Sequence, residues 1–194
     1  MRDELLAILG KKPDFSGLIG LETGGQQIRV AEGFASREHH VKNGAHTRFA
    51  TASVTKGFTA VAILRYLDRG QLELEDEIGM HLDLEGTLID PSATLLQLMD
   101  HTSGIADYFD EDIEGDYEAL WHEHPAYLMR ETGDFFPLFA YRPPVSEPGV
   151  AFSYCNAGFI LLGMVLEHVS EVVEYPGHCR VFLAQGRPRY LQPL

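Results

Sequence analysis

The sequence predicts an α+β protein, and three stretches of the chain support that prediction. Two segments of alternating apolar and polar residues flank the Gly-rich turn Thr23–Gln26 and are typical of a β-hairpin. A long apolar run at helical spacing follows Ser53, and a second one spans residues 157–170. A strand pair followed by helices is characteristic of the α+β class.

The elements before Ser53 are short. We expect a helix over residues 3–10, strands over residues 15–22 and 27–34, a polar loop over residues 36–47, and a short strand over residues 48–51. The loop contains three histidines at positions 39, 40 and 46, but their spacing matches no metal motif. We therefore interpret them as solvated side chains.

The apolar helix after Ser53 should run to Arg69, with Gly70 closing it. An extended acidic connection should follow, over about residues 72–78. A short capped helix is expected next, beginning near Ser92 or Thr94. Asn156 is the predicted cap of the helix over residues 157–170.

The segment between these helices, residues 106–125, is acidic and aromatic. It ends in His122-Glu123-His124, which suggests a metal site at first sight. On a helix, however, side chains two residues apart diverge, and no third ligand is evident, so the sequence favours no metal there. Trp121 and Tyr127 are interpreted as ordinary packing or as the wall of a cleft.

Composition narrows the possible partners. At 194 residues the chain is long enough for one sizeable domain, and its formal net charge of −14 argues against nucleic acid and against anionic membranes. No apolar run approaches the ~18 residues that span a bilayer, and the N-terminus resembles no signal peptide. Cys155 and Cys179 form no C-x-x-C motif. We expect a cytoplasmic protein with reduced thiols, without metal or cofactor, whose oligomeric state stays open.

Ser53 and Lys56 are three residues apart at the start of the first apolar helix and should share one face. A helix N-terminus and burial both disfavour a cationic lysine, and a neutral amine can accept the serine proton. Free backbone N–H groups in the same turn can bind a developing oxyanion. Taken alone, these residues fit a nucleophile and base less well than an N-cap serine and a solvated lysine.

Two further polar clusters lie where a loop meets a helix, at residues 101–104 (HTSG) and 154–156 (YCN). Tyr154 and Asn156 should point the same way on an extended stretch. A phenol could move a proton, and an amide could hold a substrate carbonyl. A half-buried tyrosine and a plain N-cap explain the same two residues without any function.

Three motifs together resemble the serine β-lactamase-related family, which groups class C β-lactamases, D-alanyl-D-alanine carboxypeptidases and related esterases. They are residues 49–60 (FATASVTKGFTA), 98–105 (LMDHTSGI) and 148–159 (PGVAFSYCNAGF). S-x-x-K alone is a weak signal, but the three motifs in this order and spacing are specific. The resemblance covers about residues 15–170.

The resemblance implies Ser53 as the acylated nucleophile, Lys56 as its base, and Tyr154 as the group that passes a proton to or from the leaving group. Asn156 would bind the substrate amide or neighbouring groups. The implied fold is a mainly antiparallel sheet flanked by helices and joined to an all-helical region. We accordingly divide the chain into residues 1–71 with the hairpin and nucleophile helix, the helical region 72–145, the Tyr-x-Asn segment with its helix at 146–170, and a divergent tail, 171–194.

The tail departs from the family. Members run to ~300 residues or more and carry a third motif, K-T-G or H-x-G, on a late strand; the last 24 residues here contain neither. We expect the family's C-terminal strands and helix to be missing, through a shortened or frame-shifted end. With part of the cleft wall gone, the isolated chain should hydrolyse substrates weakly or not at all, because one oxyanion donor can be worth about 100–1,000-fold in rate.

The sequence therefore predicts a serine hydrolase that cleaves an ester or amide through an acyl-enzyme on Ser53. The motifs do not separate a β-lactam, a D-alanyl peptide and a small ester as substrate. The alternative is a non-catalytic remnant that acts as a binding or interaction module.

Overall fold

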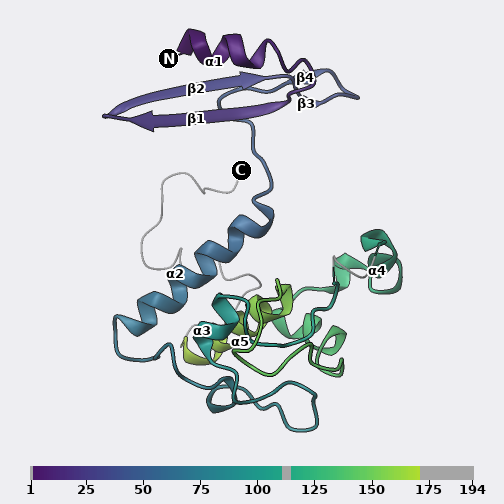
Figure 1. Ribbon diagram of the computed structural model, residues 1–194. Coiled ribbons are helices and arrows are strands. Elements are labelled where there is room, and N and C mark those ends of the chain that lie inside the picture. Colours follow the sequence, from purple (N-terminus) through teal and green to yellow (C-terminus); the bar gives the residue numbers. More distant parts are fainter. Residues whose placement is uncertain (1, 111–114, 171–194) are drawn as a thin grey trace. The chain divides into compact units, whose positions relative to one another are not determined.

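The strands and the long helices of the computed structural model occupy different parts of the chain (Figure 1), as the α+β prediction requires. The structure describes residues 2–110 and 115–170. These residues form two compact units, one ending at Thr51 and the other beginning at Ala52. The predicted division into four segments stays a prediction, and the divergent tail, residues 171–194, lies outside the described residues.

The first unit contains one helix and two small antiparallel sheets. Its elements are α1 (Arg2–Leu9), β1 (Gly17–Thr23), β2 (Gln26–Glu32), β3 (Phe34–Ser36) and β4 (Val41–Lys42). The β1–β2 hairpin pairs Gly17 with Glu32 at one end and Thr23 with Gln26 at the other. Gly24 and Gly25 both have positive φ, which suits a tight two-residue hairpin turn and agrees with the predicted turn.

Two predictions for this unit were wrong. The second strand does not run unbroken to Phe34, because Gly33 has a φ of +70° and separates β2 from β3, and β3 pairs with β4 inside the predicted loop. Residues 48–51 form no strand, since no strand of the described part pairs with them.

The second unit is helical. Its helices are α2 (Thr55–Leu67), α3 (Leu95–Met99), α4 (Tyr117–Glu123) and α5 (Asn156–Val169). Short 3-10 turns complete it: η1 (Ala52–Val54), η2 (Ile78–Met80), η3 (Ala126–Leu128) and η4 (Thr132–Leu138). No helix of the described residues combines the length and apolar character that crossing a bilayer requires.

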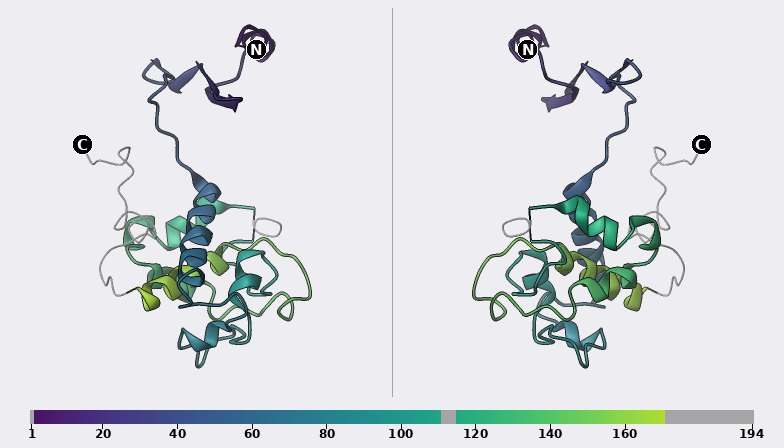
Figure 2. Two further views of the ribbon diagram at one scale, coloured as in Figure 1. Left: turned by 90° about the vertical axis from the view of Figure 1, so that its left-hand side faces the viewer. Right: turned by 90° about the vertical axis from the view of Figure 1, so that its right-hand side faces the viewer.

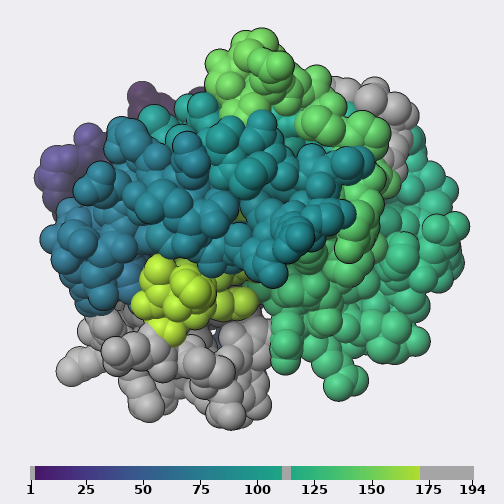
Figure 3. All heavy atoms as spheres, turned by 90° about the horizontal axis from the view of Figure 1, so that it is seen from below, coloured from purple at the N-terminus to yellow at the C-terminus, as the bar shows by residue number. Residues whose placement is uncertain are grey.

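Helix α5 lies at the centre of the second unit and contacts α2, α3 and η4 (Figures 1 and 2). Its apolar face, with Leu161, Leu162, Val165 and Leu166, is fully buried. Burying each such side chain is worth about 1.5–3 kcal/mol, so α5 holds the unit together. On the face that Figure 3 shows, the yellow end of the described chain reaches the surface, and the exposed residues Glu167 and His168 belong to this last turn of α5.

Helix α2 is less buried than its apolar sequence predicts. Thr59, Ala62, Ile63 and Tyr66 are buried, and α5 packs against this helix. The opposite side exposes Phe58, Val61 and Leu64, each by more than two fifths. The helix ends at Leu67. As predicted, Gly70 follows the end of the helix, and its φ of +65° lets the chain turn there.

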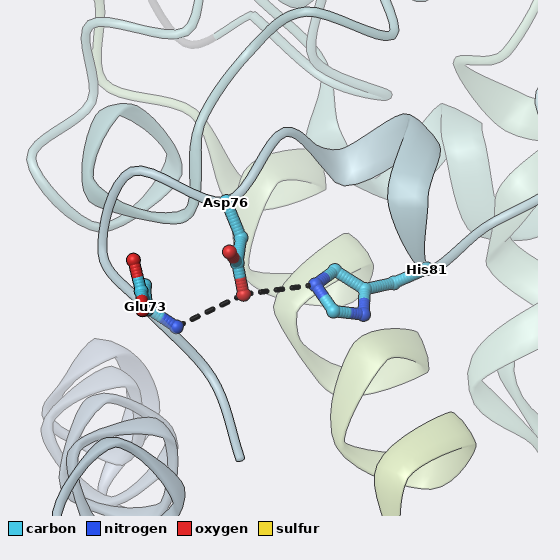
Figure 4. Close-up of polar contacts among 3 residues, drawn as sticks. All are labelled: Glu73, Asp76 and His81. Carbon is cyan, nitrogen blue, oxygen red and sulfur yellow. Dashed lines mark hydrogen bonds and ion pairs between the residues drawn. The ribbon is translucent and has the colours of Figure 1, made fainter. Parts of the chain in front are cut away.

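The acidic connection after α2 folds back on itself rather than running extended. Asp76 accepts hydrogen bonds from the Glu73 backbone N–H (2.9 Å), and its carboxylate lies 3.2 Å from His81 Nε2 (Figure 4). Thr94 then begins α3 with a capping box: its hydroxyl accepts from Gln97 N–H, and the Gln97 side chain accepts from Thr94 N–H. Of the two predicted caps, Thr94 is therefore the one used.

The aromatic segment packs only in part. The Trp121 ring contacts Tyr117 and Phe135 edge-on, as ordinary packing predicts, whereas Tyr127 is three quarters exposed. Ordinary packing was therefore the wrong alternative for Tyr127, and its role as the wall of a cleft stays a prediction.

The turn at residues 100–104 connects α3 to the segment that precedes α5. Gly104 accepts a hydrogen bond from Val145 N–H, the Thr102 carbonyl accepts from Gly149 N–H, and the His101 carbonyl accepts from Ser153 N–H. His101 Nδ1 also accepts from Cys155 N–H at 3.1 Å. These bonds fix the residues that lead into α5.

We predict that Gly104→Ala destabilises the chain by more than about 2 kcal/mol. Gly104 has a φ of +71°, and an added Cβ would overlap the carbonyl oxygen of Ser146. Gly57→Ala is the matched control, because its site in α2 is open and alanine favours a helix by about 1 kcal/mol. Urea unfolding followed by tryptophan fluorescence measures both; equal or stabilising effects of the two substitutions would contradict the structure.

We also predict a pH-dependent contribution from His101. Burial, followed by the charge of Lys56, lowers the pKa of His101, so the native ring is neutral and can accept from Cys155. A lowered folded pKa gives stability that is complete above the unfolded value of about 6.5 and is lost as pH falls through the folded pKa.

The test variant is His101→Asn, because asparagine tolerates the φ of +64° and keeps an acceptor but does not titrate. As the pH is lowered from 7 to 4, the unfolding free energy of the unmodified chain should fall more steeply than that of the variant. His122→Asn, on exposed α4, controls for the loss of a histidine. Parallel curves for the chain and His101→Asn would refute the prediction.

Candidate active site

Ser53 lies in the 3-10 turn η1, two residues before α2 begins at Thr55, and not inside the helix as predicted. Lys56 is the second residue of α2. Ala52, directly before Ser53, has a φ of +44°, which is costly for a residue with a Cβ. Such strain often accompanies functional sites, and here it accompanies an exposed serine.

The structure brings the four predicted site residues together. Lys56 Nζ donates to Ser53 Oγ at 3.1 Å and to Asn156 Oδ1 at 2.7 Å. Ser53 Oγ and Tyr154 Oη share a hydrogen bond of 2.6 Å. Lys56 Nζ also lies 4.8 Å from the centre of the Tyr154 ring, within cation–π range. Ser53 therefore touches both groups that could take its proton.

The start of α5 differs from the prediction. Cys155 is the N-cap, and its Sγ accepts from Gly158 N–H at 3.4 Å. Asn156 is the first residue of the helix, so its amide is free to turn toward Lys56. The sequence favoured the polar side chain of Asn156 as the cap. It did not favour Cys155, because sulfur is a weak hydrogen-bond acceptor.

Cys155 itself is not a competing nucleophile. Burial raises the pKa of its thiol to about 12, and the thiol donates to the Ile105 carbonyl at 3.4 Å. Only the thiolate is a strong nucleophile, so this cysteine is structural at neutral pH.

Asp107 is a site residue that the sequence prediction missed. Its buried carboxylate accepts from Asn156 N–H (2.7 Å), Asn156 Nδ2 (2.8 Å), Ala157 N–H (3.0 Å) and its neighbour Tyr108 N–H (2.8 Å). It lies at the N-terminus of α5, where a negative charge is favoured. In the sequence this residue is one acid directly after Ile105 and Ala106, and only the structure shows that residues 103–107 are buried.

Burial raises the pKa of Asp107, and the N–H donors around it oppose that effect. The arrangement suits an ionised carboxylate, which only accepts hydrogen bonds. Asp107 thereby links the start of α5 to the segment after the 100–104 turn.

His101 belongs to a motif that the sequence analysis singled out without giving this residue a role, and the structure places it beside Tyr154. Its ring lies 4.6 Å from the Tyr154 ring and 5.4 Å from that of Phe159, centre to centre. The hydrogen bond from Cys155 N–H holds the His101 ring in this position beside Tyr154. His101 of the H-T-S-G motif therefore contacts the tyrosine that is hydrogen-bonded to Ser53.

Within residues 2–110 and 115–170, no group of three or more His, Cys, Asp or Glu side chains is placed to hold a metal ion. The chemistry available in the described site is that of a hydroxyl, an amine, a phenol and an amide. These groups can carry out nucleophilic attack and proton transfer.

Comparison with known proteins supports the family suggested by the motifs. The family model described as Beta-lactamase matches residues 7–177. Penicillin-binding protein 4* of Bacillus subtilis (strain 168) is 28% identical over 173 residues, which are 86% of this chain and 35% of that protein. Protein flp of Staphylococcus aureus (strain N315) is 28% identical over 168 residues, 84% of this chain and 31% of its own.

Solved structures give the same result. A penicillin binding protein from Bacillus halodurans is 40% identical with a TM-score of 0.78, covering 86% of this chain and 50% of that one. A D-stereospecific amidohydrolase from Streptomyces sp. is 25% identical with a TM-score of 0.60, covering 78% and 43%. The chain thus spans about a third of the curated relatives and half or less of these structures. With a family model matched over most of its length, the chain belongs to the Beta-lactamase family.

Proposed function

We propose that this protein is a serine hydrolase that cleaves an ester or amide through an acyl-enzyme on Ser53. One observation carries the proposal: Ser53 Oγ lies within hydrogen-bond distance of both Lys56 Nζ and Tyr154 Oη. A hydroxyl becomes a useful nucleophile when a neighbouring base removes its proton. The first requirement for that proton transfer is that the base lies within hydrogen-bond distance of the hydroxyl.

In the proposed reaction, Lys56 in its neutral form accepts the Ser53 proton as Oγ bonds to the substrate carbonyl carbon. Tyr154 then passes a proton to the leaving oxygen or nitrogen as its bond to that carbon breaks. Water later attacks the acyl carbon and gives a proton to the Tyr154 phenolate. The bond from that carbon to Ser53 Oγ then breaks, the carboxylic acid leaves, and Oγ takes its proton back from the Lys56 ammonium. Asn156, which accepts from Lys56, holds the amine beside the serine.

The substrate is proposed only as a class: a β-lactam, a D-alanyl peptide or a small ester. The names of the relatives refer to penicillin binding and to D-stereospecific amide hydrolysis by those proteins. We further propose that the 194-residue chain turns over slowly or not at all, because it contains no K-T-G or H-x-G sequence. A non-catalytic binding module remains the second candidate, favoured by that same lack of a third motif.

We predict that a fluorophosphonate or a fluorescent penicillin labels Ser53. Intact-mass spectrometry should show one adduct, and peptide mapping should place it on Ser53. Ser53→Ala should abolish the label, and Lys56→Met should slow labelling by about 100–10,000-fold, since general-base catalysis contributes that much. Ser92→Ala removes a serine from the turn at residues 90–92 and is the matched control. A folded chain that takes no label would favour the binding module.

We predict that steady-state hydrolysis of p-nitrophenyl acetate by the purified chain is close to the background rate, even where Ser53 is labelled. The expected pattern is one equivalent of product without sustained turnover. Robust hydrolysis that Ser53→Ala abolishes would show that residues 1–194 suffice for catalysis and would overturn the proposal of weak turnover.

A further inference from the structure

The contacts of Asp107 suggest a role beyond the start of α5. We propose that Asp107 is a positioning residue: it fixes the orientation of the Asn156 amide and so holds the Lys56 amine beside Ser53. The inference rests on the proposed function of Ser53. It adds a residue that acts without touching the substrate.

The first argument is that the Asp107 carboxylate is saturated. Oδ2 accepts from both nitrogens of Asn156, at 2.7 and 2.8 Å, and Oδ1 accepts from Tyr108 and Ala157, at 2.8 and 3.0 Å. An ionised carboxylate offers about four acceptor positions, and here four N–H donors approach them. A proton on either oxygen would face an N–H group, so this arrangement fits the ionised form.

The second argument concerns the Asn156 amide. Its oxygen and nitrogen ends have almost the same shape, so neighbouring groups decide which way it points. Because the carboxylate can only accept, it selects the Nδ2 end and turns Oδ1 toward Lys56 Nζ, 2.7 Å away. A flipped amide would place oxygen against the carboxylate and N–H donors against the lysine amine.

The third argument links this orientation to the nucleophile. Lys56 Nζ is held between Asn156 Oδ1 and Ser53 Oγ, at 2.7 and 3.1 Å. Without the amide oxygen the flexible lysine side chain would lose one of its two fixed partners. A displacement of about 1 Å at a reacting group can cost about 100-fold in rate.

Other ionisable groups face Asp107 and enter any pH dependence. They are His101, Tyr108, Cys155 and, through its hydrogen bond to the Asp107 carbonyl, Arg142. Of these, the half-buried Tyr108 and the buried Cys155 have raised pKa values, so both stay protonated between pH 4 and 8. His101 is the group whose titration must be separated from that of Asp107.

The test is a double-mutant cycle on the rate of Ser53 labelling by a fluorophosphonate. Asp107→Asn should slow labelling by about 100-fold in the unmodified chain. In an Asn156→Ala background it should change the rate by no more than about twofold, because the two residues act as one unit. An equal loss in both backgrounds would overturn the inference.

Asp116→Asn is the matched control. Asp116 also accepts from backbone N–H groups at the start of a helix, those of Glu118 and Ala119 in α4, and has no contact with Ser53 or Lys56 among those described. It should lose helix-capping stability without slowing the labelling. Circular dichroism of each variant reports whether it is folded.

An NMR titration of the unmodified chain needs neither folding of a variant nor reaction at Ser53. The Asn156 side-chain NH2 resonances should titrate together with the Asp107 carboxyl carbon. Resonances that follow the His101 ring, or that do not move, would contradict the inference. If the chain takes no label at all, the proposed function fails, and this titration alone decides the role of Asp107.

Discussion

The convergence of N–H groups on the Asp107 carboxylate is the contact on which the rest of the candidate site depends. A buried carboxylate is costly unless its acceptor positions are filled, and α5 supplies three of the donors from its first two residues. The N–H groups at the start of α5 thus offset the cost of burying the carboxylate, and the carboxylate gives those N–H groups the acceptors that a helix N-terminus lacks. The same contact sets the direction of Asn156, which in turn reaches Lys56 and Ser53.

The site is built from three junctions between an irregular segment and a helix. Ser53 and Lys56 come from the start of α2, His101 from the turn after α3, and Tyr154 and Asn156 from the start of α5. Helix packing alone brings these ends near one another, because α5 contacts both α2 and α3. The finer placement comes from polar contacts such as the bond from Cys155 N–H to His101 Nδ1. A rigid helical core therefore supports groups that must stay within hydrogen-bond distance.

Much of this arrangement could be predicted from the sequence because its signals are local. Apolar spacing predicted α2 and α5, the Gly24-Gly25 pair predicted the hairpin turn, and Thr94 was one of two candidate caps for α3. The motifs also named the four residues that the structure brings together. Asp107 could not be found this way: in an acidic segment, one buried carboxylate looks like any solvated one until the chain is folded. The same limit hid the β3–β4 pairing and the exposed side of α2, since neither follows from periodicity.

The central claim is that Ser53, Lys56, Tyr154 and Asn156 form one hydrogen-bonded group prepared for acylation. A crystal structure of the chain after reaction with a serine-directed acylating probe tests this most directly. The account predicts continuous electron density from Ser53 Oγ into the probe, with Lys56 Nζ still bound to Asn156 Oδ1 and Tyr154 Oη beside the modified oxygen. Density on another side chain, or an acylated Ser53 with Lys56 and Tyr154 turned away from it, would contradict the account.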